Sequence, residues 1–126
     1  MIEEKILDKE KKALERWGQG DPSGYLEISH KDVTYFDPFI DARIDGLDTL
    51  TKYYEGLKGK IQIDQFEIIN PRFIISDNLV VLSYNYVSYS DNNKFLWNCT
   101  EVYQKIDEDW KIIQTHWSIT KPKFQT

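Results

Sequence analysis

Cysteine is almost absent from this sequence of 126 residues. Cys99 is alone, so the chain has no disulfide framework and no paired-thiol metal motif. Long apolar runs are also lacking, since none approaches the roughly 18 residues of a membrane-spanning helix. The first residues, MIEEKILDKEKK, are too charged for a secretory signal peptide. These absences predict a cytoplasmic protein without membrane contact.

Clusters of positive charge are scarce as well. The chain has 16 Lys and Arg against 21 Asp and Glu, a net charge of −5, and its basic residues form no stripe. Nucleic acid is not an expected partner, because neutralising phosphates requires clustered basic residues. The sequence lacks a glycine-rich phosphate loop, a dinucleotide fingerprint and a nucleophile elbow. Its two histidines and scattered carboxylates lack metal-ligand spacing, so no metal site is predicted.

Aromatic residues are abundant, at 14% of the chain with four Trp and eight Tyr. Large rings with a polar tip suit a core that opens into a cavity or an interface, and they also suit the plain filling of a curved sheet. The length fits one domain, spanning residues 1–126, with a core that needs no disulfide or metal.

Three helices are predicted in the first half of the chain. Apolar residues at helical spacing among Glu and Lys predict an amphipathic helix over 2–17. Asp21 followed by Pro22 is typical of a helix start, and it predicts a short second helix to about Ser29. The stretch LDTLTKYYEGL predicts a third helix over 47–57.

Strand patterns fill most of the remainder. DVTYFDP predicts a strand with Val33, Tyr35 and Asp37 on one side, and FIDARIDG predicts a second short strand ending at Gly46. Five further strands are predicted, separated by turn signals, over 61–66, 68–75, 79–90, 95–106 and 110–119. Helices segregated from hairpin-linked strands predict an α+β fold in which the helices cover one face of a bent sheet.

The last hairpin carries the candidate chemistry. A two-residue turn in the acidic stretch DED places Glu101 opposite Gln114 and Cys99 opposite His116. Glu101 and His116 are then diagonal neighbours about 7–8 Å apart. On this register the face of Glu101 also carries Trp97, Tyr103, Ile112 and Ser118.

The orientation of the preceding strand, 79–90, stays open on residue patterns alone. A three- or five-residue loop puts Asn85 on the face of Glu101, and a four-residue loop puts Tyr84 and Tyr86 there. Both faces of the last hairpin carry apolar residues, so we expect one to meet the helices and the other a second subunit.

Three residues are candidates for proton transfer. His116 beside Glu101 could be a base oriented by a carboxylate, and a structural histidine is the competing interpretation. Asp37 could abstract a proton if apolar walls raised its pKa, or it could simply cap the strand before Pro38. Cys99 has no neighbour that marks it as an activated thiol and is expected to be a small buried residue.

Five stretches in order, GQGDPSGYLEIS, DVTYFDP, RIDGLDTLTKYYE, IINPRFIISDNLVVLSYNY and TEVYQKIDEDWKIIQTHWS, resemble the SnoaL-like branch of the NTF2-like superfamily. The chain is especially similar to the association domain of calcium/calmodulin-dependent protein kinase II and its bacterial stand-alone relatives. The resemblance implies a cystatin-like cone of three N-terminal helices on a strongly curved, mostly antiparallel sheet. It also implies a pocket between the layers and a homodimer formed through the sheet.

The resemblance implies a site as well. Asn85 and Glu101 match positions where the kinase domain has pocket arginines, on the side of the histidine matched by His116. It therefore puts these three residues in one cavity, and the missing arginines favour a neutral or cationic ligand over an anion. We expect its walls to come from Trp17, Tyr25, Phe39, Tyr54, Trp97 and Cys99.

Two functions follow as expectations. The first is binding of a small molecule, with isomerase, cyclase or dehydratase chemistry by proton transfer and no cofactor, as in the ketosteroid isomerase-like enzymes of the superfamily; His116 or Asp37 would be the base. The second is a non-catalytic association module with a vestigial pocket, favoured by an outward-facing Trp117 with Ile113 and Ile119. Fold-level analogy does not choose between them.

Overall fold

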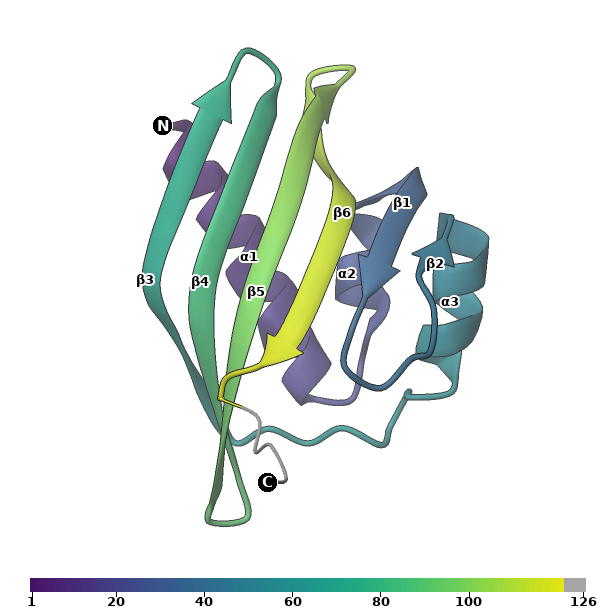
Figure 1. Ribbon diagram of the computed structural model, residues 1–126, viewed down its shortest axis with the longest axis vertical. Helices are drawn as coiled ribbons and strands as arrows, with labels where there is room; N and C mark the ends of the chain where they lie inside the picture. The colour runs from purple at the N-terminus through teal and green to yellow at the C-terminus, as the bar shows by residue number, and fades with distance from the viewer. Residues whose placement is uncertain (122–126) are drawn as a thin grey trace.

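The computed structural model describes residues 1–121 and packs three helices on one face of a curved six-stranded sheet (Figure 1). The sheet order is β2-β1-β6-β5-β4-β3, with β1 parallel to β6 and every other pair antiparallel. The elements are α1 (Ile2–Gly18), α2 (Ser23–Glu27), β1 (Ser29–Phe36), β2 (Ile44–Asp45), α3 (Leu47–Glu55), β3 (Gln65–Ser76), β4 (Leu79–Ser90), β5 (Asn93–Ile106) and β6 (Asp109–Ile119). The predicted α+β cone is confirmed.

The core lies between α1, α3 and the inner face of the sheet. On α1 the buried positions Ile6, Glu10, Ala13 and Leu14 recur at helical spacing, so one stripe of this helix faces the sheet. The sheet supplies fully buried residues from alternate strand positions: Val33, Val80, Leu82, Tyr103 and Ile112. No helix within residues 1–121 is long and apolar enough to cross a membrane.

The two strands predicted over 61–66 and 68–75 form one strand, β3, which begins only at Gln65. Its pairing with β4 shifts register between Ile69 and Arg72, and Asn70 inside this bulge has a φ of 50°. The Asn-Pro pair therefore bends a continuous strand, because a bulge accommodates the missing proline N–H.

A second bulge decides which β6 residues face the helices. The turn between β5 and β6 has the predicted two residues, since Ile106 pairs with Asp109. The register then shifts between Val102 and Tyr103, where β6 carries one extra residue. Thr115 consequently lies opposite Glu101, and every later β6 side chain points to the face opposite to the predicted one.

The outer face of the sheet, which faces the viewer in Figure 1, carries no helix from residues 1–121. Its residues form rows across the strands. An apolar row joins Ile74, Val81 and Val102, and Ile74 is 69% exposed. The next row joins Arg72, Ser83, Thr100, His116 and Phe36.

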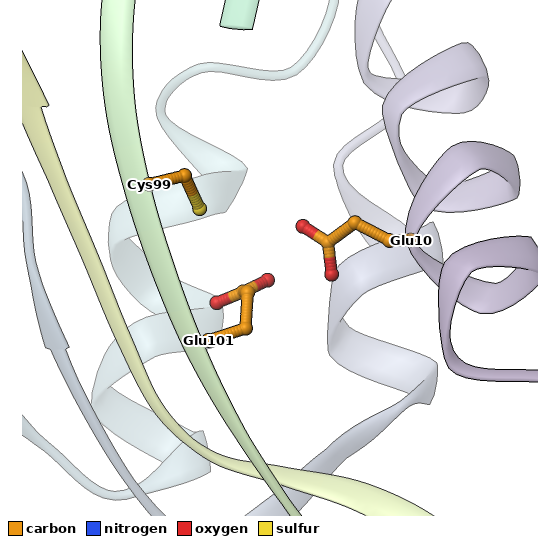
Figure 2. Close-up of side chains that lie close together, drawn as sticks. All are labelled: Glu10, Cys99 and Glu101. Carbon is orange, nitrogen blue, oxygen red and sulfur yellow. The ribbon is translucent and has the colours of Figure 1, made fainter. Parts of the chain in front are cut away.

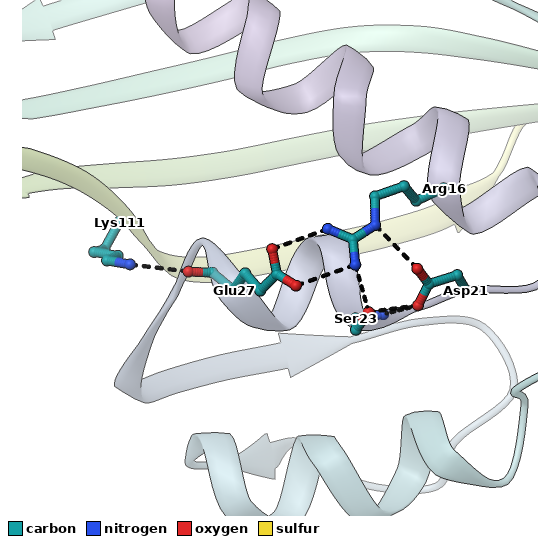
Figure 3. A network of polar contacts seen from close by, with 5 residues as sticks. All are labelled: Arg16, Asp21, Ser23, Glu27 and Lys111. Carbon is teal, nitrogen blue, oxygen red and sulfur yellow. Dashed lines mark hydrogen bonds and ion pairs between the residues drawn. The ribbon is translucent and has the colours of Figure 1, made fainter.

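A network around Arg16 fixes α2 against α1 and β6 (Figure 3). The Arg16 guanidinium donates two hydrogen bonds to the Glu27 carboxylate, at 2.9 and 3.1 Å, and others to Asp21 at 3.0 Å and Ser23 at 2.7 Å. Hydrogen bonds from the Ser23 hydroxyl and backbone N–H, together with Arg16, lower the pKa of Asp21 to about 2. Lys111 on β6 donates to the backbone oxygen of Glu27 at 2.9 Å. The network holds Tyr25, on α2, in place over the core.

Candidate functional site

A carboxylate inside the cone, Glu10, is held by three tyrosines from three elements. Its Oε2 accepts hydrogen bonds from the hydroxyls of Tyr25 on α2 at 2.8 Å and Tyr84 on β4 at 2.5 Å. Its Oε1 accepts one from Tyr103 on β5 at 2.5 Å. Glu10 is 0% exposed. Three hydroxyl donors on one carboxylate stabilise its negative charge inside the protein.

Glu101 faces Glu10 from the sheet (Figure 2). It is also 0% exposed, because its position on β5 points toward α1. Neither of its carboxyl oxygens accepts a hydrogen bond of good geometry from a donor in residues 1–121, and its nearest polar neighbours are Glu10 and the Thr115 hydroxyl. A carboxyl oxygen of each glutamate and the Cys99 sulfur lie within 4.8 Å of one another. The site therefore contains two carboxyl groups, of which Glu10 accepts three hydroxyl hydrogen bonds and Glu101 lies beside it.

Burial sets the protonation of this pair. Removal from water, and secondarily the nearby Glu10, raises the pKa of Glu101 well above its usual 4.5. Burial also raises the pKa of the Cys99 thiol and of the Tyr25, Tyr84 and Tyr103 hydroxyls. No buried residue in 1–121 is Lys, Arg or His. Burial therefore favours the protonated form of Glu101.

Aromatic rings connect this pair to the surface. Phe39 is 71% exposed on the loop after β1, and its ring packs edge-on against Trp97 at 5.9 Å between centroids. Trp97 contacts Trp117 at 6.3 Å, and Trp117 contacts Tyr84 at 6.1 Å. Tyr84 is one of the three donors to Glu10. We call the four residues Phe39, Trp97, Trp117 and Tyr84 the aromatic series.

Asp37 forms a second carboxylate and tyrosine cluster at the end of β1. It accepts hydrogen bonds from the hydroxyls of Tyr35 at 2.8 Å and Tyr53 at 2.6 Å, and from the backbone N–H of Phe39 at 2.8 Å. Burial, followed by charges that include Asp37, raises the pKa of Tyr35. Asp37 is only half-buried, and its hydrogen bond with the Phe39 backbone places it near the exposed end of the aromatic series.

Glu10, Cys99 and Glu101 are close enough to be considered as metal ligands. The tyrosine hydroxyls, however, already occupy three of the four lone-pair positions of Glu10. Thiolate coordination also requires loss of the Cys99 proton, which burial opposes. The arrangement suits a shared proton or a hydrogen-bond donor better than a coordinated metal ion.

The structure separates residues that the sequence placed together. His116 is exposed on the outer face, where its ring lies 4.9 Å from that of Phe36, and it pairs with Thr100. The β6 bulge is the reason, so the predicted pairing with Cys99 and the shared cavity with Glu101 are wrong. Asn85 is also on the outer face, where it donates to the Asn98 side chain at 2.7 Å.

The loop before β5 explains the position of Asn85. Ser90 pairs with Asn93, so the loop has two residues, Asp91 and Asn92, both with positive φ. Loops of two and of four residues are both even in length, so they orient the side chains of the preceding strand in the same way. The observed loop therefore puts Tyr84 and Tyr86 on the inner face, as the four-residue alternative does. The choice of Asn85 over the two tyrosines was therefore wrong.

Other predicted residues do lie in the interior layer. Trp17 packs edge-on against Tyr25 and Tyr54, at 6.2 and 5.1 Å, and both tyrosines are buried. Cys99 is 2% exposed and lies beside Glu101. Trp117, predicted to face outward, packs on Tyr84, Tyr86 and Trp97 because of the β6 bulge.

Glu10 is not among the residues predicted for the site, and it lies in the charged stretch DKEKK. A signal was available, because Glu10 falls four residues after Ile6 and three and four residues before Ala13 and Leu14. A charged residue on the apolar stripe of a helix calls for a buried partner.

Replacing Glu101 with Gln is expected to remove a pH dependence of stability. Below pH 4.5 Glu101 is protonated in both the folded and the unfolded chain. As the pH rises, only the unfolded chain releases this proton, so the native protein loses up to about 1.4 kcal/mol of stability per pH unit until its own pKa is reached. Urea unfolding between pH 4.5 and 8 should show this loss in the parent protein but not in Glu101→Gln.

Glu108→Gln is the matched control, because the Glu108 side chain is 92% exposed. It should keep the parent's pH dependence. Parallel curves for the parent and Glu101→Gln would contradict a raised pKa at Glu101.

Tyr103→Phe is expected to lower the free energy of unfolding at neutral pH by roughly 1.5–3 kcal/mol, because a buried, charged Glu10 loses one donor. Tyr89→Phe is the control, since the Tyr89 hydroxyl donates to Glu67 at 3.2 Å in an exposed position. Urea unfolding should show a clearly smaller loss for Tyr89→Phe. Equal losses would mean that the three hydroxyls do not stabilise charge on Glu10.

Comparisons with known proteins agree with this architecture. The calcium/calmodulin dependent protein kinase II association domain model matches residues 3–121. A crystal structure from Parabacteroides distasonis ATCC 8503, of a protein provisionally named a ketosteroid isomerase, is 43% identical, covers 93% of this chain and 86% of that chain, and has a TM-score of 0.86. No curated protein sequence matches the chain.

Two more distant structures share the fold. An NTF2-like protein of unknown function from Pseudomonas putida KT2440 is 17% identical, with a TM-score of 0.82 over 93% of this chain and 85% of that one. The association domain of C. elegans CaMKII is 18% identical, with a TM-score of 0.75 over 92% and 94%. The family match covers nearly the whole chain, and this protein therefore belongs to the calcium/calmodulin-dependent protein kinase II association domain family, with an NTF2-like fold.

Proposed function

We propose that the cone interior is a small-molecule site that acts by cofactor-free proton transfer. The observation that carries this proposal is the fully buried pair of Glu10 and Glu101, which lie close together without a buried cation in 1–121, and in which burial raises the pKa of Glu101. Pairs of titratable groups whose different environments give them different pKa values are typical of acid–base sites. A purely structural core has no need of such a pair, which is costly to bury.

The chemistry follows from the two environments. Protonated Glu101 donates a hydrogen bond or a proton to a substrate oxygen, as a general acid in an isomerisation or a dehydration does. Glu10, stabilised by three hydroxyls, keeps the countercharge in place. Asp37 is the second candidate base, at the exposed end of the aromatic series. The name given to the Parabacteroides relative supports this reaction class.

The tryptophans offer a direct test of where a small molecule binds. Trp97 and Trp117 belong to the aromatic series, whereas Trp110 lines a separate groove between α1 and the end of the β5–β6 hairpin. In NMR titrations with a library of small aromatic and carbonyl fragments, binders should shift the indole N–H signals of Trp97 and Trp117. Trp110 serves as the internal control. Fragments that shift only Trp110, or none that bind, would refute an interior site.

A second function, self-association, is favoured by the outer face of the sheet. No helix of the described part of the chain lies over that face, and it presents the apolar row Ile74, Val81 and Val102 beside polar rows. A mixed surface with an apolar centre is typical of subunit interfaces. The association-domain family and the hub structures among the fold neighbours support the same function. We propose a homodimer formed through this face.

Ile74→Glu should therefore dissociate the dimer, because it places a charge in the apolar row. Light scattering coupled to size-exclusion chromatography should give a monomer for Ile74→Glu and a dimer for the parent. Phe39→Glu, a change at an equally exposed residue off the sheet face, should remain dimeric. A monomeric parent at micromolar concentration would refute self-association.

A further inference from the structure

We propose that a groove along α1, on the outside of the cone, is a docking site for an extended acidic peptide in which acidic and apolar side chains alternate. The groove lies between α1, α2 and the turn of the β5–β6 hairpin, and its volume is about 560 Å³. Clefts of roughly 300–1,000 Å³ are typical of binding sites. Because the groove is separate from the cone interior, this inference does not rest on the proposed function.

One wall of the groove is a row of basic side chains on α1. Its members follow one another at intervals of four, three and four residues and therefore share one side of the helix: Lys5, Lys9, Lys12 and Arg16. Lys105 on β5 adds a fifth basic side chain. With four acidic residues in the lining, the groove has a net charge of +1, in a chain whose net charge is −5. The groove thus has the sign of charge that attracts an anionic partner.

The excess positive charge lies with Lys5, which forms no ion pair within residues 1–121. Lys9 pairs with Asp109 at 3.2 Å, and Lys12 pairs with Asp8 at 2.9 Å. Both of these carboxylates are more than half exposed. Ion pairs in contact with water contribute little to stability, so a carboxylate of a ligand can join or replace them. All three lysines are therefore available to a ligand.

The floor of the groove is apolar. Trp110, which is only 6% exposed, lines the groove together with Ile2, Ala13, Gly24 and Ile28. Apolar side chains of a ligand gain free energy when they leave water for such a surface. The groove consequently suits a ligand that carries both negative charges and apolar groups.

The opposite wall disfavours a uniform polyanion such as nucleic acid. It contains Glu27, whose carboxylate already binds Arg16 (Figure 3), and the acidic side chains Glu108 and Asp109. Phosphates that follow one another without interruption would meet these carboxylates, and they would leave the apolar floor unused. A peptide can place its charges toward the lysines alone.

The spacing of the lysines matches an extended peptide. From Lys5 to Lys9 the helix rises about 6 Å, and from Lys9 to Lys12 it rises about 4.5 Å. Alternate side chains of an extended chain point in the same direction and lie about 6.6 Å apart. The flexible stem of lysine accommodates the remaining difference. Acidic side chains at alternate positions can thus meet the three lysines, while the apolar side chains between them turn toward the floor.

Three acetylated and amidated pentapeptides test the proposal on the unmodified chain: ELELE, QLQLQ and EEELL. Isothermal titration calorimetry at low salt should show ELELE binding about tenfold or more tighter than QLQLQ, because several ion pairs form with the lysines. EEELL has the composition of ELELE without the alternation, and it should bind more weakly than ELELE. In NMR titrations ELELE should shift the indole N–H signal of Trp110 and leave those of Trp97 and Trp117 unchanged.

Lys5→Gln and Lys9→Gln should each weaken the binding of ELELE by about threefold, because each removes one exposed ion pair with the peptide. Lys11→Gln is the matched control, since Lys11 is exposed on the same helix but does not line the groove. This variant should keep the affinity of the parent. Circular dichroism establishes that each variant is folded.

Several results would overturn the proposal. Equal binding of QLQLQ would mean that the basic row is not used, and equal binding of EEELL would reduce the effect to unspecific attraction. Equal losses in Lys11→Gln and Lys5→Gln would have the same meaning. If an oligothymidylate binds more tightly than ELELE, the groove is a nucleic-acid site and the peptide inference fails. It also fails if no peptide shifts the signal of Trp110, whatever the fragments show at Trp97 and Trp117.

Discussion

The burial of two carboxyl groups without a basic partner in residues 1–121 is the constraint on which the interior of this protein depends. Removing an ionised carboxylate from water costs several kcal/mol. Three hydrogen bonds to Glu10, each worth roughly 1.5–3 kcal/mol when the acceptor is charged, offset this cost. The donors come from α2, β4 and β5, and the acceptor from α1. One carboxylate thus joins four elements, and the Arg16 network secures α2, the most peripheral of them.

The composition of the site is decided by the bulge on β6. Without the extra residue, His116 would face Glu101, and Trp117 would be on the outer face. With the extra residue, four β6 side chains face the helices: Trp110 and Ile112 before the bulge, and Thr115 and Trp117 after the bulge. The interior consequently gains an aromatic wall and loses its only candidate imidazole. That exchange favours carboxylic acid chemistry over histidine chemistry in the cone.

The sequence predicts the elements well because their signals are local. The helical stripe of α1, the turn residues of DED and the alternation in β1 each act over a few positions. The bulges and the partner of Glu101 depend on contacts between distant segments, such as Glu10 with Tyr103, 93 residues apart. The adjacent apolar pair Ile112 and Ile113 was the one local sign that the alternation changes phase on β6. The resemblance to a family led to the wrong placement of Asn85, because it put Asn85 and His116 in one cavity with Glu101, whereas both lie on the outer face.

The two proposed functions occupy opposite faces of the same strand. Along β5, Cys99, Glu101 and Tyr103 face the interior, and Thr100 and Val102 face the outer surface between them. Protein interiors are packed too densely for one face of a strand to move alone. Any change of sheet curvature on assembly therefore moves Glu101 relative to Glu10, which is anchored on α1. If both proposed functions hold, assembly through the outer face and ligand binding in the cone are coupled through β5, because each acts on the position of Glu101.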